Sequence, residues 1–285
     1  MRRNSRSRCL FGMIVLGITF AVTATAQTPT PSPTPSPEKD FFKHILQDQK
    51  AIWTAPFHIQ RGDAKWVVPG SIGLMALFTT DRMTGDEIGE SDRQVNASNA
   101  ISYAGSAYGV GAAAGAFYLL GRKKHDARAR ETGVLIAEAT IDSAIVYATL
   151  KGVTQRARPA DGIERSEFFD GGSSFPSGHS TSAWTAATII ASEYHDNRAI
   201  QIAAFATASA VSVARFSGHK HYLSDVIAGS ALGYGVGKYV YHKRHNKSLD
   251  ASDDGGPVSK LWRPAITPEF DRRTHTYGAG LTWSF

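Results

Sequence analysis

Six apolar segments of helical length follow one another between residues 66 and 241 of this 285-residue chain. None of them alternates apolar and polar side chains in the way that a half-buried strand does. The pattern therefore predicts an all-α fold with a six-helix core bundle. The expected helices cover residues 66–79, 100–121, 133–150, 180–194, 199–215 and 222–241.

The start of the chain has the pattern of an export signal. Four arginines within the first eight residues precede an apolar run over residues 9–22, and Ala24-Thr25-Ala26 follows. A basic start, a short apolar centre and small residues at the exit predict a secretory signal peptide over residues 1–26. An uncut anchor helix is the alternative, although the run is short for a membrane span. Cys9, the only cysteine, would leave with the signal.

The segments on either side of the bundle have different characters. Residues 27–38 are rich in proline and predict an extended linker. Residues 39–60 carry apolar side chains at helical spacing, which predicts an amphipathic helix packed on the main domain; a helix lying on a membrane is the alternative. The main domain covers residues 61–247. Residues 248–285 begin as a polar linker and end in alternating apolar and small residues, which predicts a short C-terminal β-hairpin involving residues 261–270.

The charge of the mature chain is close to balanced. The whole sequence has a net charge of +6, but the four arginines of the signal account for most of it. Such a balance argues against a general nucleic-acid binder. The acidic residues of the 80–99 connection fit no EF-hand spacing, so we expect a solvated loop there and no metal site.

Three short motifs supply an inventory suited to phosphoryl transfer. They contribute, in order, Lys151 and Arg158; Ser177, Gly178 and His179; and Arg215, His221 and Asp225. Fixed cations stabilise the charge that spreads over the oxygens of a transferring phosphoryl group, and a guanidinium contacts two oxygens at once. Backbone N–H groups at a helix start, expected at Ser177 and Gly178, favour an anion.

The two histidines can divide the chemistry. His221 and Asp225 stand four residues apart, so on a helix they would share one face. A carboxylate bonded to one ring nitrogen leaves the other nitrogen free to attack phosphorus, and His179 can protonate the leaving oxygen. Arg156 and Lys220 are interpreted as bystanders that add positive field.

The order Lys-x6-Arg-Pro, Pro-Ser-Gly-His, Arg-x5-His-x3-Asp resembles the signature of the type 2 phosphatidic acid phosphatase (PAP2) and vanadium haloperoxidase superfamily. The resemblance covers roughly residues 66–243 and implies that superfamily's helical bundle. It implies that His221 is the nucleophile that forms a phosphohistidine, with Asp225 as its partner and His179 as the acid. It assigns phosphate binding to Lys151, Arg158, Ser177, Gly178 and Arg215. One departure is Ala214, where the family usually has serine; Ser217 lies close in sequence, but that closeness alone does not make it a substitute.

The expected function is an exported, metal-independent phosphatase of phosphomonoesters or pyrophosphates. Lipid phosphates such as phosphatidic acid or isoprenyl pyrophosphate are favoured, and no cofactor is needed. One alternative is a vanadate-dependent haloperoxidase, with vanadate as its cofactor; another is a non-catalytic envelope protein that binds lipid or cell wall.

We expect the mature chain in a bacterial cell envelope, facing the periplasm and associated with a membrane. The segment 100–121 is long enough and apolar enough to cross. Glu138 and Asp142, inside a predicted helix, argue against a span because carboxylates are costly in lipid.

Overall fold

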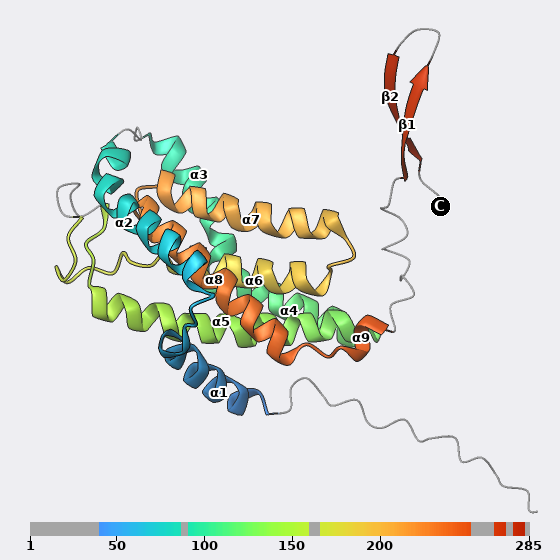
Figure 1. Cartoon of the computed structure of the whole chain (residues 1–285), viewed down its shortest axis with the longest axis horizontal. Coiled ribbons are helices and arrows are strands. Elements are labelled where there is room, and N and C mark those ends of the chain that lie inside the picture. The colour runs from blue at the N-terminus through green and yellow to red at the C-terminus, as the bar shows by residue number, and fades with distance from the viewer. Residues whose placement is uncertain (1–39, 87–90, 160–165, 252–264, 272–275, 283–285) are drawn as a thin grey trace, which may run out of the picture. The chain divides into compact units, whose positions relative to one another are not determined.

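The computed structural model describes residues 40–86, 91–159, 166–251, 265–271 and 276–282. The predicted signal peptide over residues 1–26, the linker over 27–38 and most of the acidic 86–92 stretch lie outside these residues. Figure 1 shows the helices that make up the predicted domain. Their bounds are α1 Phe41–Thr54, η1 Ala55–His58, α2 Ala64–Asp86, α3 Asp92–Ser102, η2 Tyr103–Gly105, α4 Ala107–Lys124, α5 Ala127–Thr154, α6 Gly178–Glu193, α7 Arg198–Ser217, α8 Leu223–Arg244 and α9 Ser248–Ala251.

The all-α prediction is confirmed for the domain, with two differences in where helices begin and end. The predicted 100–121 helix is divided, because η2 and the N-cap Ser106, whose side chain accepts from Gly109 N, start α4 separately. The expected solvated loop over residues 80–99 is wrong for most of that stretch, since α2 continues to Asp86 and α3 covers Asp92–Ser102. Helix α2 also continues through Pro69. Pro69 lies near the start of α2, so its ring can disturb only the first turn.

The C-terminal hairpin was also predicted. Strand β1 (Ala265–Asp271) pairs antiparallel with β2 (Thr276–Thr282), and Ala265 lies opposite Thr282. The partner segment proposed from the sequence, residues 261–270, overlaps most of β1.

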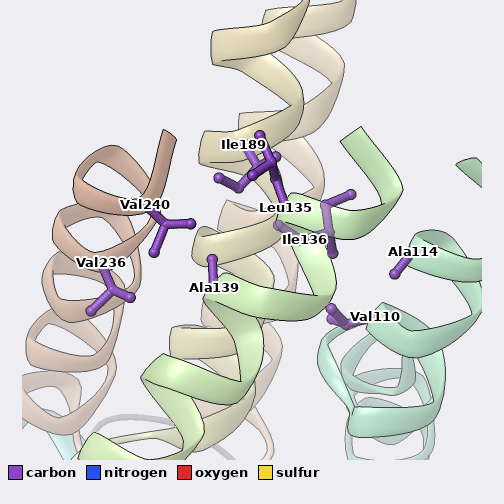
Figure 2. Close-up of a cluster of buried hydrophobic side chains, with 9 residues drawn as sticks. Val110, Ala114, Leu135, Ile136, Ala139, Ile189, Val236 and Val240 are labelled. Carbon is purple, nitrogen blue, oxygen red and sulfur yellow. The ribbon is translucent and has the colours of Figure 1, made fainter. Parts of the chain in front are cut away.

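Helix α6 is central to the packing and contacts α5, α7 and α8. The largest apolar cluster joins four helices, as Figure 2 shows. Its buried members are Val110 and Ala114 of α4, Leu135, Ile136 and Ala139 of α5, Ala186 and Ile189 of α6, and Val236 and Val240 of α8.

Glycines at every fourth position of α8 let it lie directly against α6. A Cβ added at Gly229 would lie 2.6 Å from the carbonyl oxygen of Ser177, and one at Gly233 would overlap the carbonyl oxygen of Thr181. At Gly237 an added Cβ would lie 2.9 Å from the Cβ of Thr188. This close approach places the N-terminal turns of α6 and α8 side by side.

Helix α1 packs on α5 through only part of the apolar face that its sequence suggests, and Ile52 contacts the main apolar cluster. Ile45 is buried, whereas Phe42 and Leu46 are 80% and 74% exposed. The buried Asp48 instead receives hydrogen bonds from Tyr239 and Arg244 of α8. A polar network therefore holds α1 in place.

Candidate active site

The three motifs lie at the end of α5, the start of α6 and the α7–α8 connection, which come together at one end of the bundle; Figure 1 shows the helices. Lys151 lies in the last turn of α5 and Arg158 in the loop that follows. His179 lies in the first turn of α6 and Arg215 in the last turn of α7. Because these helices alternate in direction, their C-terminal and N-terminal ends come together and bring residues from distant positions into one site.

The cations and His179 are close enough to influence one another. Burial, and then the positive charges of Arg215, Arg158 and Lys151 in that order, lower the pKa of His179 to about 4. A half-buried imidazole surrounded by three cations is therefore neutral in the empty site. An anion bound there would face three positive charges at once.

The loop between α5 and α6 holds two of these cations. The Lys151 ammonium donates to the carbonyl oxygens of Ser173, at 2.5 Å, and Ser174, at 3.3 Å. Arg158 donates to the hydroxyl of Ser173 at 3.1 Å. Backbone hydrogen bonds fix this loop in turn, since Ser174 N donates to the carbonyl oxygen of Arg156.

His221 and Asp225 face each other, but the expectation that they share one helix face is wrong. Helix α8 begins at Leu223, so His221 lies in the turn before it. Asp225, in the first turn, reaches back and accepts from the backbone N–H of Tyr222 at 3.0 Å. A carboxylate that caps its own helix in this way is directed toward the preceding turn.

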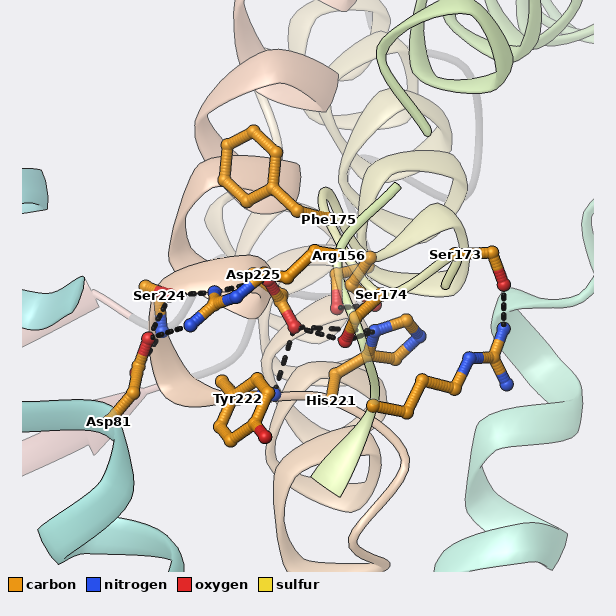
Figure 3. A network of polar contacts seen from close by, with 12 residues as sticks. Asp81, Arg156, Ser173, Ser174, Phe175, His221, Tyr222, Ser224 and Asp225 are labelled. Atoms are coloured by element: carbon orange, nitrogen blue, oxygen red, sulfur yellow. Dashed lines mark hydrogen bonds and ion pairs between the residues drawn. The ribbon is translucent and has the colours of Figure 1, made fainter. Parts of the chain in front are cut away.

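A third side chain lies between this pair. The Nδ1 atom of His221 is 3.7 Å from Oδ2 of Asp225, which is longer than a hydrogen bond. The Ser174 hydroxyl lies 2.5 Å from the same carboxylate oxygen and 3.4 Å from Nδ1 (Figure 3). Burial, opposed in part by Asp225, lowers the pKa of His221 to about 4.

Arg156 is not the bystander that the sequence suggested. It is 1% exposed and forms ion pairs with Asp225, at 2.7 Å, and with Asp81, at 2.8 Å. Figure 3 shows it between the two carboxylates. The sequence analysis missed Arg156, Asp81 and Ser174. Two of them stand next to motif residues, but Asp81 belongs to no motif and could not have been found.

One of the two backbone N–H groups expected to bind an anion at the start of α6 already has another acceptor. The Ser177 backbone N–H donates to the carbonyl oxygen of Asp225 at 3.0 Å, so it is not available to a phosphate. The Ser177 side chain is fully buried and accepts from the Ser180 hydroxyl. At Gly178 an added Cβ would lie 3.1 Å from the ring of Tyr147, so only glycine fits there without displacing that ring.

Ser217 does not replace the hydroxyl that Ala214 lacks. Its side chain hydrogen-bonds to Ser98 of α3, and its carbonyl oxygen accepts from Gln94. Ser217 therefore connects α7 to α3.

The described residues contain one group with metal-ligating side chains, formed by Glu131, Glu193 and His245. It lies at the opposite ends of α5, α6 and α8 from the motifs. The Nδ1 atom of His245 is 3.0 Å from Glu131 and 3.1 Å from Glu193, and these contacts account for the cluster as a hydrogen-bonded network.

The later part of the domain is similar to proteins of a known family. Residues 132–249 match the PAP2 superfamily. A lipid A 1-phosphatase from Porphyromonas gingivalis is 35% identical over 69 residues, which are 24% of this chain and 16% of that relative's length. A structure described as the first transmembrane PAP2 type phosphatidylglycerolphosphate phosphatase from Bacillus subtilis has 19% sequence identity and a TM-score of 0.43, and the alignment covers 78% of this chain and 99% of that one.

Proposed function

Because the chain carries a PAP2 superfamily domain over residues 132–249, we propose that it is a phosphatase that hydrolyses lipid phosphates through a phosphohistidine. The observation that carries the proposal is the meeting of three cations, two histidines and one carboxylate at one end of the bundle. Each group has a role in phosphoryl transfer, and no single helix supplies more than a part of them.

In the first step, the substrate phosphate binds among Lys151, Arg158 and Arg215. The Nε2 atom of His221 attacks phosphorus while the bond from phosphorus to the leaving oxygen breaks. His179 donates a proton to that oxygen as it leaves. A neutral His221 with Nδ1–H directed toward Ser174 and Asp225 has the nucleophilic lone pair on Nε2.

In the second step, a water molecule attacks the phosphohistidine. His179 accepts the proton of the water, the bond from nitrogen to phosphorus breaks, and inorganic phosphate leaves. His221 returns to its neutral form. His179 takes up a proton from solvent when the anionic substrate binds, donates it in the first step and regains one from water in the second. With Lys151, Arg158 and Arg215 facing the phosphate charge, the proposed reaction needs no metal ion.

An apolar groove beside the site favours a lipid substrate. A cavity of about 730 Å³ is lined by α1, α4 and α5, and Tyr147 is among its lining residues. The same ring packs against Gly178, next to His179. Acyl or isoprenyl chains in this groove would therefore lie close to the proposed phosphate site.

Exposed apolar side chains support association with a membrane. Helices α5 and α7 are long enough and apolar enough to cross one by length and composition. Helix α2 exposes Trp66, Val67, Val68, Ile72 and Met75. The carboxylates that argued against a bilayer are covered, since Glu138 pairs with Arg244 and Asp142 accepts from Gln49 of α1. We propose a membrane-associated envelope protein whose site faces the periplasm.

Phosphate release from the purified chain in the presence of EDTA tests the proposal. The panel contains a soluble phosphomonoester, phosphatidic acid, an isoprenyl pyrophosphate and lipid A. Lipid A is included because the Porphyromonas relative is named a lipid A 1-phosphatase. We expect release from a lipid substrate that falls at least ~10³-fold in His221→Gln. The matched control is His195→Gln, since His195 lies beyond the other end of α6.

Two outcomes would reject the proposal. A fully active His221→Gln protein would exclude the phosphohistidine. Absence of release from every substrate, with vanadate- and peroxide-dependent halogenation present, would favour the haloperoxidase alternative; absence of both activities would favour a binding role.

A further inference from the structure

We infer that Arg156 and Asp81 are positioning residues that hold Asp225 ionised and directed toward the nucleophile His221. The inference rests on the proposed function and deepens it, because it adds two residues outside the three motifs. It also assigns a task to α2, which contributes no motif.

Arg156 connects the two carboxylates through separate nitrogens. Its NH1 group donates to Oδ1 of Asp225 at 2.7 Å, and its NH2 group donates to Oδ2 of Asp81 at 2.8 Å. Ser224 completes the arrangement: its hydroxyl accepts from the same NH1 at 2.7 Å, and its backbone N–H donates to Asp81 at 3.1 Å. The side chains of Arg156, Asp81 and Asp225 are at most 1% exposed, so none of the three charges is in contact with bulk water.

Three aromatic rings set the plane of the guanidinium. Its central carbon lies 4.4 Å from the Tyr222 ring, 4.9 Å from the Phe168 ring and 5.2 Å from the Phe78 ring. A guanidinium enclosed by rings keeps its donors in fixed directions. A lysine could not replace this arrangement, because an ammonium is a single point charge.

The two oxygens of Asp225 have different partners. Oδ1 binds Arg156, whereas Oδ2 faces Ser174, Tyr222 N and His221. Holding one oxygen therefore aims the other at the nucleophile. Burial by itself would raise the pKa of Asp225, but the nearby His221, the charge of Arg156 and the hydrogen bond from Ser174 keep it below its ordinary value.

Asp81 is the buried side chain through which α2 contributes a charge to the site. Among the described side chains of α2 it alone is buried, whereas Trp66, Ile72 and Met75 are exposed. A helix that is otherwise exposed thus contributes one carboxylate, 75 positions before Arg156, to the base of the site. A buried charge without its partner is costly, so Asp81 and Arg156 depend on each other.

The pH profile of phosphate release distinguishes positioning from a merely structural role. The charged and titratable groups around Asp225 are Arg156, His221, Lys151 of α5 and, through Arg156, Asp81 of α2. Removing the cation in Arg156→Gln favours protonation of the His221–Asp225 pair, so the acid limb of kcat/KM should move up by about one pH unit. Removing the anion in Asp81→Asn should move the same limb down.

We expect kcat to fall ~10- to 100-fold in Arg156→Gln while KM changes less than ~3-fold, because phosphate is bound by other cations. Arg156→Lys should keep the wild-type position of the acid limb but not the full kcat. Arg198→Gln, an exposed arginine at the first residue of α7, is the control and should leave both unchanged. The inference would be overturned if the acid limbs of kcat/KM in Arg156→Gln and Asp81→Asn lay at the same pH.

A second readout needs no turnover. Nitrogen chemical shifts of His221 report its tautomer and its titration. We expect Nδ1–H in the wild type, and in Arg156→Gln a titration shifted to higher pH. If the titration shifts in Arg156→Gln but the wild type releases no phosphate, the proposed phosphatase is rejected and the positioning role is retained. If the wild type and Arg156→Gln are both active and their His221 spectra are identical, the positioning role is rejected and the phosphatase is retained. If Arg156→Gln does not fold, Asp81→Asn and Arg156→Lys carry the same comparison.

Discussion

The Nδ1 atom of His221 lies 3.7 Å from Oδ2 of Asp225, and the Ser174 hydroxyl lies within hydrogen-bond reach of both atoms. The coupling of this histidine to its carboxylate is thus partly indirect. Serine can donate to the carboxylate and accept from the imidazole at the same time. Removing the Ser174 hydroxyl therefore measures how much of the coupling between His221 and Asp225 passes through it.

Ser174→Ala should lower kcat by about 10-fold, since one hydrogen bond to a charged group contributes about 1.5 kcal/mol. We expect KM for the substrate to change little, because Ser174 contacts the phosphate-binding side through its carbonyl oxygen alone. Steady-state kinetics check this. Ser192→Ala, near the opposite end of α6, is the control. An unchanged kcat in Ser174→Ala would show that the pair interacts directly.

The pKa of His179 should rise when an oxyanion binds. Burial and three cations lower it to about 4 in the empty site. A bound phosphate or vanadate offsets those positive charges, so the protonated form becomes favourable and His179 can act as an acid. Titration by NMR with and without vanadate measures the shift, with His195 as the internal reference. A His179 pKa that vanadate leaves in place would contradict its role as the acid.

Two glycines of α8 should respond to alanine in opposite directions. A Cβ at Gly233 would overlap the Thr181 carbonyl oxygen, whereas a Cβ at Gly235 would meet nothing within 4 Å. We expect Gly233→Ala to lower the free energy of unfolding by about 1–3 kcal/mol, through overpacking against α6. Gly235→Ala should raise it by up to about 1 kcal/mol, because alanine favours the helix. Thermal unfolding compares them, and equal melting temperatures would contradict the direct contact of α6 and α8.

The stability of the other end of the bundle should depend on pH through Glu193. Burial first, and then the charge of Glu131, raise the pKa of Glu193 to about 7 from 4.5. The folded state therefore holds a proton that the unfolded state releases, so this contribution is complete below pH 4.5 and is lost as the pH rises through 7. We expect the melting temperature to fall less between pH 5 and pH 8 in Glu193→Gln than in the wild type.

The matched variant for that experiment is Glu167→Gln, an exposed carboxylate in the loop before α6. It should retain the pH dependence of the wild type. A Glu193→Gln protein with that same dependence would mean that the proton is held elsewhere in the bundle.

Much of the fold was predictable because helix periodicity is a local property. Residues 133–150, 180–194, 199–215 and 222–241 each fall within or within one residue of α5, α6, α7 and α8. The division between α3 and α4 was not predictable in the same way. Gly105 lies at that break, where an added Cβ would lie 2.5 Å from Val211 and 2.7 Å from the His179 carbonyl oxygen. The residues that require a glycine at this break therefore come from α6 and α7, not from the local sequence.

The sequence by itself determined the chemistry of the site, since three ordered motifs name its cations, its histidines and its carboxylate. Only the tertiary structure decided which of two arginines, two positions apart, serves which purpose. Arg158 lies among the cations around His179, while Arg156 is enclosed between Asp225 and Asp81. The physical reason is that the role of an arginine depends on the charged groups that contact it in the folded chain. The carboxylate that holds Arg156 comes from α2, far away in the chain, and no local pattern records it.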